Sequence, residues 1–209
     1  VVSVETAYLN SASLDHYEGY DVSATADFSD LPFIGGDLRV QIQWTHLVEN
    51  TTVDATGISD DYVGQCYDFG ESCFNRDRST GLFTWSKGDW TVNWVTRFMS
   101  GISAPEDALD FFGAADGGVN PYTGAAFPAG VFEDVMDTYS IEDYYYNNAS
   151  VSYQYDDNTR VNVAITNVFD EEAPYYKSFF GFVDPQINSP QNTYDIVGQY
   201  VTASVSYSF

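Results

Sequence analysis

Polar and apolar residues alternate with a period of two along much of the chain, and the last nine residues show the pattern without interruption. Positions 201, 203, 205, 207 and 209 carry Val, Ala, Val, Tyr and Phe, whereas the positions between them carry Thr or Ser. A period of two places successive side chains on opposite faces of an extended strand. The alternation therefore predicts a strand at residues 201–209 with one apolar and one polar face.

The same pattern predicts eight strands in all. Besides 201–209, they are residues 3–9, 18–28, 37–45, 76–85, 90–100, 145–155 and 160–168. Turn-forming residues such as Gly, Pro, Asn and Asp make short connections at 29–36, 86–89 and 156–158. A modest polar loop at 10–16 and long segments at 49–75, 101–136 and 169–197 make the others. Tight turns and longer loops therefore alternate along the chain.

This order of connections is typical of an antiparallel transmembrane β-barrel. Outer-membrane barrels have short periplasmic turns, long outer loops, an apolar outer face and aromatic girdles. If the C-terminus is periplasmic, every tight turn lies on the periplasmic side and every long loop lies outside. Phe209, at the end of a strand with nothing after it to cover the ring, suits such an interface. The strand count alone fits either a complete small barrel or the last part of a large one.

Composition supports strands and excludes several classes of protein. The chain has 17 Tyr and 15 Phe, and residues of this kind are enriched in strands. No run of about 18 apolar residues is present, so the sequence offers no transmembrane helix. The excess of 31 acidic over 7 basic residues, a net charge of −24, argues against nucleic-acid binding. Three tryptophans, Trp85, Trp90 and Trp94, suggest an interfacial belt, although a core cluster would look similar.

Cys66 and Cys73 lie close together in a polar segment. A disulfide that closes a small loop in an oxidising compartment is the favoured interpretation, because two thiols without a nearby His pair make a weak metal site. His16 and His46 are far apart, and no Ser/His/Asp or Cys/His spacing stands out. The sequence therefore argues against an enzyme.

Acidic residues are concentrated in the long connections. Oxygen-rich clusters suit Ca²⁺ or cations that bridge to an anionic lipid surface, although a solvated, salt-adapted surface is the favoured interpretation. No other cofactor is expected. The weak candidates for metal ligands are Asp60, Asp61, Asp68 and Glu71.

Aromatic residues in the long connections have two interpretations as well. They can stack on a sugar ring or an aromatic ligand, but more often they pack loops against one another. The candidates for ligand contact are Tyr62, Tyr67, Phe111, Phe112, Tyr175 and Tyr176. On the polar strand faces, we expect basic residues to find structural partners before ligands, because buried charges must be paired. These residues are Arg39, Arg78, Arg97 and Arg160.

Two segments near the C-terminus resemble TonB-dependent outer-membrane receptors. After the penultimate strand comes Asn167-Val-Phe-Asp-Glu-Glu-Ala-Pro174, and Tyr194-Asp-Ile-Val-Gly198 leads into the terminal strand that ends in Phe209. The family typically has an Asn-aromatic-Asp-Glu-Pro-like turn, a Tyr-Asp-x-x-Gly-Arg-like entry and a terminal Phe. Gln199 replaces the basic residue of that entry. Residues 17–21 and 82–90 also look like parts of the family.

The resemblance implies an all-β, antiparallel transmembrane barrel of about 22 strands. Residues 1–209 would be its C-terminal segment, with the plug domain and first strands outside this chain. We expect a fragment or processed product, because the chain opens inside an alternating stretch without a signal-peptide pattern.

Membership would further imply import of a scarce solute of the siderophore, vitamin or oligosaccharide class across the bacterial outer membrane. The TonB complex would drive this import through the plug, and the rest of the receptor and outer-membrane lipid would be further partners. The barrel-assembly machinery would read the terminal strand at Tyr207 and Phe209.

Two other classes stay open from the sequence. The first is a self-contained eight-stranded outer-membrane barrel that acts as an adhesin or a structural anchor. The second is a secreted all-β, lectin-like module that uses acidic loops and Ca²⁺.

Overall fold

The computed structural model describes residues 13–54, 57, 59–67, 72–103, 140–174 and 194–209. The predicted strand at 3–9 lies outside these ranges. Among the described residues there is no apolar helix of membrane-spanning length.

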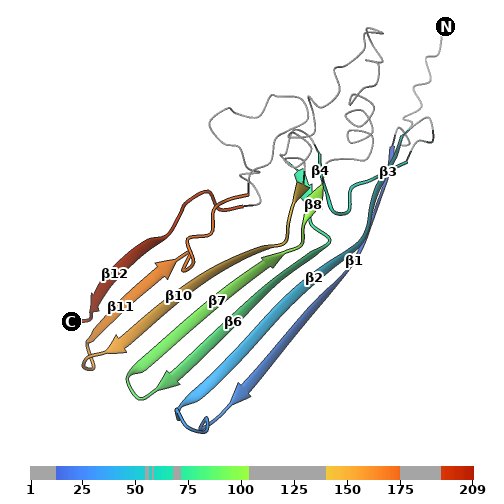
Figure 1. Ribbon diagram of the computed structural model, residues 1–209. Helices are drawn as coiled ribbons and strands as arrows, with labels where there is room; N and C mark the ends of the chain where they lie inside the picture. Colours follow the sequence, from blue (N-terminus) through green and yellow to red (C-terminus); the bar gives the residue numbers. More distant parts are fainter. Residues whose placement is uncertain (1–12, 55–56, 58, 68–71, 104–139, 175–193) are drawn as a thin grey trace, which may run out of the picture.

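One antiparallel sheet dominates the structure, and its long strands follow their order in the sequence (Figure 1). Each pairs with its neighbours along the chain, so the sheet is a meander built from successive hairpins. Its strands are β1 (Ser13–Phe28), β2 (Asp37–Asp54), β6 (Asp77–Lys87), β7 (Trp90–Met99), β10 (Tyr144–Gln154), β11 (Thr159–Thr166) and β12 (Tyr200–Tyr207), and β3 (Ser59–Asp61) extends the sheet beside the end of β2.

The three predicted tight turns are confirmed and lie at one end of the sheet, which we call the turn end (Figure 1). At the opposite end, the loop end, four short strands form a second sheet in the order β5-β4-β8-β9. They are β4 (Gln65–Tyr67), β5 (Ser72–Phe74), β8 (Ile102–Ser103) and β9 (Ser140–Ile141), all too short to be visible as alternation in the sequence.

The strand register keeps apolar side chains on one face across the whole main sheet. Directly paired residues lie on the same face, so a row can be followed from strand to strand. One such row is apolar on every strand, namely Phe28, Leu38, Trp85, Val92, Val151, Val163 and Ala203. Val163 is 41% exposed and Val205 is 69% exposed, so the described residues do not cover this face with a dry core.

The opposite face is polar and is hydrogen-bonded from strand to strand. Arg39 Nε donates to Asp27 Oδ1 at 2.7 Å between β2 and β1. The Thr84 hydroxyl donates to Asn93 Oδ1 at 2.8 Å, and Asn93 Nδ2 donates to the Ser150 hydroxyl at 3.3 Å. The predicted division into an apolar and a polar face is therefore confirmed.

The first hairpin is longer than the sequence analysis predicts. Residues 13–16 and 49–54 belong to β1 and β2, where the prediction placed loops. A β-bulge interrupts the pairing between Glu18 and Gly19, because Glu18 pairs with Glu49 and Gly19 pairs with Leu47. The extra residue, Val48, lies on β2 and shifts the period of two there, so the alternation stops before that strand ends.

Gly19 is required at this bulge by a close backbone approach. A Cβ atom added there would lie 2.7 Å from the carbonyl oxygen of His46. We therefore expect Gly19→Ala to lower the free energy of unfolding by about 1–3 kcal/mol, as overpacking does. Urea unfolding of the full-length protein, followed by tryptophan fluorescence, measures this effect.

The matched control is Ser23→Ala, a substitution on the same strand and on the polar face. It should leave the unfolding midpoint close to that of the unaltered protein. Equal midpoints for the two variants would show that the backbones can move apart at the bulge.

Candidate functional site at the loop end

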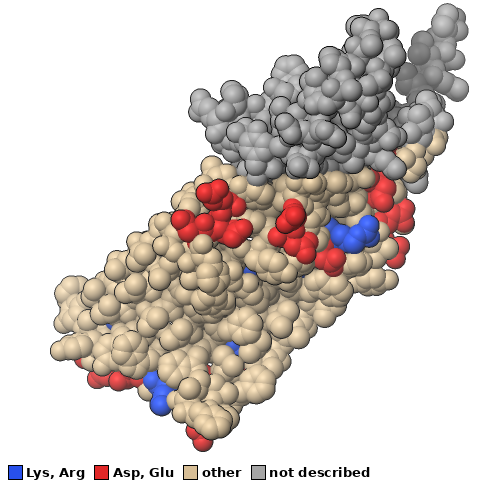
Figure 2. All heavy atoms as spheres, in the orientation of Figure 1, with Lys and Arg blue, Asp and Glu red and all other residues tan. Residues whose placement is uncertain are grey.

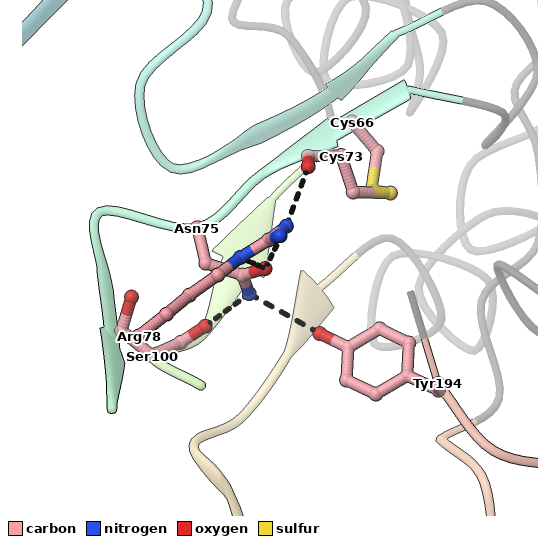
Figure 3. The surroundings of a disulfide bond; sticks show 6 residues. All are labelled: Cys66, Cys73, Asn75, Arg78, Ser100 and Tyr194. Carbon is pink, nitrogen blue, oxygen red and sulfur yellow. Dashed lines mark hydrogen bonds between the residues drawn. A yellow bond between two sulfur atoms is a disulfide. The ribbon is translucent and has the colours of Figure 1, made fainter. Parts of the chain in front are cut away.

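The predicted disulfide between Cys66 and Cys73 is confirmed (Figure 3). The two cysteines face each other in the pairing of β4 with β5. The bond therefore closes a short hairpin that stands at the loop end of the main sheet.

A hydrogen-bond network joins this hairpin to the main sheet (Figure 3). Arg78 on β6 donates through Nη2 to the carbonyl oxygen of Cys73 at 2.9 Å and to Asn75 Oδ1 at 2.8 Å. The buried Asn75 amide donates to the Ser100 carbonyl oxygen at 2.6 Å and to the Tyr194 hydroxyl at 3.4 Å. Segments far apart in the chain are thereby held together beside the disulfide.

Three tyrosines pack beneath the hairpin and are almost completely buried. Tyr144, Tyr146 and Tyr194 are 4%, 2% and 2% exposed, and the Tyr144 ring meets the Tyr194 ring edge-on at 5.1 Å. Burial raises the pKa of Tyr194. With the disulfide they form the hydrophobic cluster of the structure, which also contains Ile102 and Ile141.

A cavity of about 170 Å³ opens beside these tyrosines. We call it the rim cavity. Its walls come from β6, β7, the start of β10 and the segment before β12. The lining residues are Arg78, Ser79, Thr80, Arg97, Phe98, Met99, Tyr144, Tyr146 and Asp195.

The polar groups that line the rim cavity differ in whether they have hydrogen-bond partners. Asp195 accepts hydrogen bonds from the Tyr146 hydroxyl and from the backbone N–H of Val197, each at 3.0 Å. Arg97 is exposed and has no hydrogen-bond or ion-pair partner among the described residues. The Tyr144 hydroxyl is buried and is likewise without a partner in the described part of the chain.

The arginines predicted on the polar face have different environments. Arg39 pairs with Asp27, as expected of a charge that finds a wall carboxylate. Arg78 binds an amide and a carbonyl oxygen in place of a carboxylate. For Arg97 and Arg160, the ranges that the structure describes provide no partner.

The candidate ligand aromatics are not brought together by the described structure. The Tyr62 ring lies 6.1 Å from that of Phe74, which is packing within the loop end, and the backbone of Tyr67 pairs with Ser72 in the disulfide hairpin. The other candidates, Phe111, Phe112, Tyr175 and Tyr176, lie outside the described residues.

Of the candidate metal ligands, Asp60 and Asp61 lie on β3, and Asp61 accepts a hydrogen bond from the backbone N–H of Val63 at 3.0 Å. Asp68 and Glu71 lie outside the described ranges. The bulged hairpin groups three other residues, His16, Glu18 and Glu49, whose potential ligand atoms lie within 4.8 Å of one another. This group could not be predicted without the register of β1 on β2.

Near the C-terminus, the two motif segments contact each other. Asn167 is fully buried with a φ of 56°, and its side chain bonds both the N–H and the carbonyl oxygen of Glu171. Asp170 Oδ1 accepts a hydrogen bond from the backbone N–H of Gln199 at 2.7 Å. Gln199 Nε2 donates to the carbonyl oxygen of Val168 at 2.8 Å. The side chain at this position thus ties the entry of β12 to the preceding turn.

Acidic side chains gather near the loop end on the face drawn in Figure 2. The middle of that face shows few charged residues. The candidate site lies at the loop end, where these acidic side chains gather.

Two crystal structures of mutants of the ferric enterobactin receptor PfeA from Pseudomonas aeruginosa share this arrangement of strands. Each aligns with a TM-score of 0.50 and 14% sequence identity, and covers 92% of this chain. The chain has the fold of a TonB-dependent receptor barrel segment. It spans 22% of the length of the receptor chains. No family model and no curated protein matches the sequence.

Sequence reasoning did not single out Tyr144, Tyr146 or Asn75 as site residues. The run Tyr144-Tyr145-Tyr146 could have indicated the tyrosine cluster. In a strand with Tyr145 on the apolar face, Tyr144 and Tyr146 share the polar face. Tyr194 lies within the resembling motif, but its contact with Asn75 bridges segments far apart in sequence.

Asn167→Ala should lower the free energy of unfolding by about 1–3 kcal/mol, because it removes a fully buried amide that makes two hydrogen bonds to the backbone of Glu171. Chemical unfolding of the full-length protein measures this loss. Asn158→Ala, in the exposed turn before β11, is the control and should change stability little. A similar effect of both substitutions would contradict a special role for the buried amide.

Proposed function

We propose that this chain forms wall and outer rim of an outer-membrane receptor that imports a scarce solute with energy from the TonB complex. The observation that supports this proposal best is a meander sheet with one exposed apolar face and one hydrogen-bonded polar face. Its fold is similar to that of the PfeA barrel. Lipid would contact the apolar face, and the polar face would line an enclosed, hydrated or plugged lumen.

In this proposal the turn end is periplasmic and the loop end is outside the cell. Aromatic rings near the turn end support a membrane interface there, since Trp90 is 48% exposed and its ring lies 4.5 Å from that of Tyr153. Exposed aromatic residues on a lipid-facing surface favour the interface between membrane and water. The disulfide hairpin would then lie on the oxidising, outer side.

The remaining strands and a plug domain would come from the rest of the receptor. Tyr207 and Phe209, whose rings meet edge-on at 5.1 Å, would be the aromatic positions read by the barrel-assembly machinery. Calcium binding at Asp60 and Asp61 stays a prediction.

The function is tested by uptake of labelled solutes into cells that produce the full-length receptor, with and without a working TonB complex. A panel of iron complexes, cobalamin and oligosaccharides covers the classes named above. We expect uptake of a member of this panel only in cells with TonB. Attachment to a surface without TonB-dependent uptake would favour the eight-stranded adhesin.

Contact with lipid has its own test. Val163→Arg places a charge on the apolar face and should lower the free energy of unfolding in bilayers by about 2–4 kcal/mol, if the position lies near the midplane. Thr202→Arg, on the polar face of the neighbouring β12, should have a much smaller effect. Equal tolerance of both charges would indicate water on both faces and contradict the membrane assignment.

A further inference from the structure

The first hairpin carries a set of potential metal ligands near the loop end, on the same face of the sheet as its apolar rows. We propose that His16, Glu18 and Glu49 bind a divalent transition-metal ion of the Zn²⁺ class. The ion would join β1 to β2 beyond the bulge. This inference goes beyond the import function and does not depend on it.

The β-bulge brings the three side chains to one face. On β1, His16 and Glu18 continue the even-numbered positions that form the apolar face. On β2 the apolar face also follows even positions until the extra residue, Val48, moves it to odd ones. Glu49 consequently pairs directly with Glu18. Without the extra residue, Glu49 would lie on the polar face.

The three side chains lie close enough together to share one ion. One potential ligand atom from each lies within 4.8 Å of the other two. His16 Nδ1 is 3.1 Å from Glu49 Oε2. Two ligand atoms of a tetrahedral zinc ion lie about 3.4 Å apart, because each bond is about 2.1 Å long. A metal ion would therefore replace the proton between these two side chains with little movement of either.

The pairing of Glu18 with Glu49 is the second observation that points to a cation. Two carboxylates directly opposite each other on one face of a sheet repel, which destabilises the pair of strands. In the part of the chain that the structure describes, neither has a Lys or Arg partner, and Glu18 has no hydrogen-bond partner. A divalent cation would neutralise both carboxylates at once.

Glu49 is already oriented for coordination. The Thr51 hydroxyl donates a hydrogen bond to Glu49 Oε1 at 3.0 Å, so Oε2 is the oxygen that is directed toward His16. Carboxylates that bind metal ions are commonly held by such hydrogen bonds. The close backbone approach at Gly19 fixes the offset of the two strands and thereby the position of this carboxylate.

The donor set favours a transition metal over Ca²⁺. Calcium takes about six to eight oxygen ligands, whereas an imidazole nitrogen suits zinc, nickel and copper ions. Three protein ligands leave a coordination position open to water or to another small ligand. The side chains of His16 and Glu49 are 54% and 40% exposed, so an ion can reach them.

Equilibrium dialysis of the full-length protein in detergent against Zn²⁺ tests the site. We expect one bound ion whose affinity falls about tenfold or more in each of the variants His16→Gln, Glu18→Gln and Glu49→Gln, because each lacks a ligand. An excess of Ca²⁺ should not displace this ion.

Unfolding in urea provides a second readout. Zn²⁺ should raise the unfolding midpoint of the unaltered protein, because an ion that binds only the folded state stabilises it, and should leave that of Glu18→Gln unchanged. With a chelator in place of Zn²⁺, Glu18→Gln should unfold at the same midpoint as the unaltered protein or at a higher one, because the substitution removes a repulsion.

The matched controls are Asp61→Asn and His46→Gln. Asp61 pairs with Thr51 on the same face but lies outside the group of three ligands. His46 lies on this face as well, and its Nδ1 atom is 2.7 Å from Asp77 Oδ1. Both variants should bind Zn²⁺ as the unaltered protein does.

Several outcomes would overturn the site. They are no binding of Zn²⁺, binding that the three ligand substitutions leave unchanged, and displacement of the ion by Ca²⁺. Equal weakening by Asp61→Asn would show only a diffuse attraction of cations to an acidic surface. A lower midpoint of Glu18→Gln in the presence of the chelator would show that this glutamate stabilises the hairpin without an ion.

Discussion

Antiparallel pairing that keeps the apolar side chains of neighbouring strands on one face is the constraint on which the rest of the structure depends. Because side chains alternate along each strand, a shift by one residue in any pair would move its apolar residues to the polar side. Apart from the one-residue shift at the bulge between Glu18 and Gly19, the observed register avoids this across the seven long strands of the main sheet. One surface is consequently fit for an apolar medium, and the other carries donors and acceptors that satisfy one another.

The loop end follows a different organisation. Here a small cluster of buried rings, the disulfide and the amide of Asn75 hold together six strands, β4, β5, β6, β8, β9 and β10, and the connections that contain Asn75, Ser100 and Tyr194. Such packing fixes the positions of Arg78 and Tyr144 far more tightly than a solvated loop could. The candidate site is therefore built on rigid elements.

Much of the main sheet could be predicted from the sequence, because its two faces require different side chains at alternate positions. The seven long strands, the three tight turns and the disulfide are confirmed. The bulge opposite Gly19 concealed the outer part of β2, since its extra residue changes the period that the prediction follows. The rim cavity could not be predicted, because its rows depend on pairing offsets between β6, β7 and β10 that no single segment encodes.

The hydrogen bond from Arg78 to the carbonyl oxygen of Cys73 makes the structure of the loop end depend on the redox state of the two cysteines. Before export, in a reducing compartment, the two thiols would be separate and the hairpin would be free to fray. Oxidation in the proposed exported state would close it and bring the carbonyl into place for the guanidinium. In the proposed outer-membrane receptor, closure of this hairpin would therefore wait until the polypeptide had left the cytoplasm.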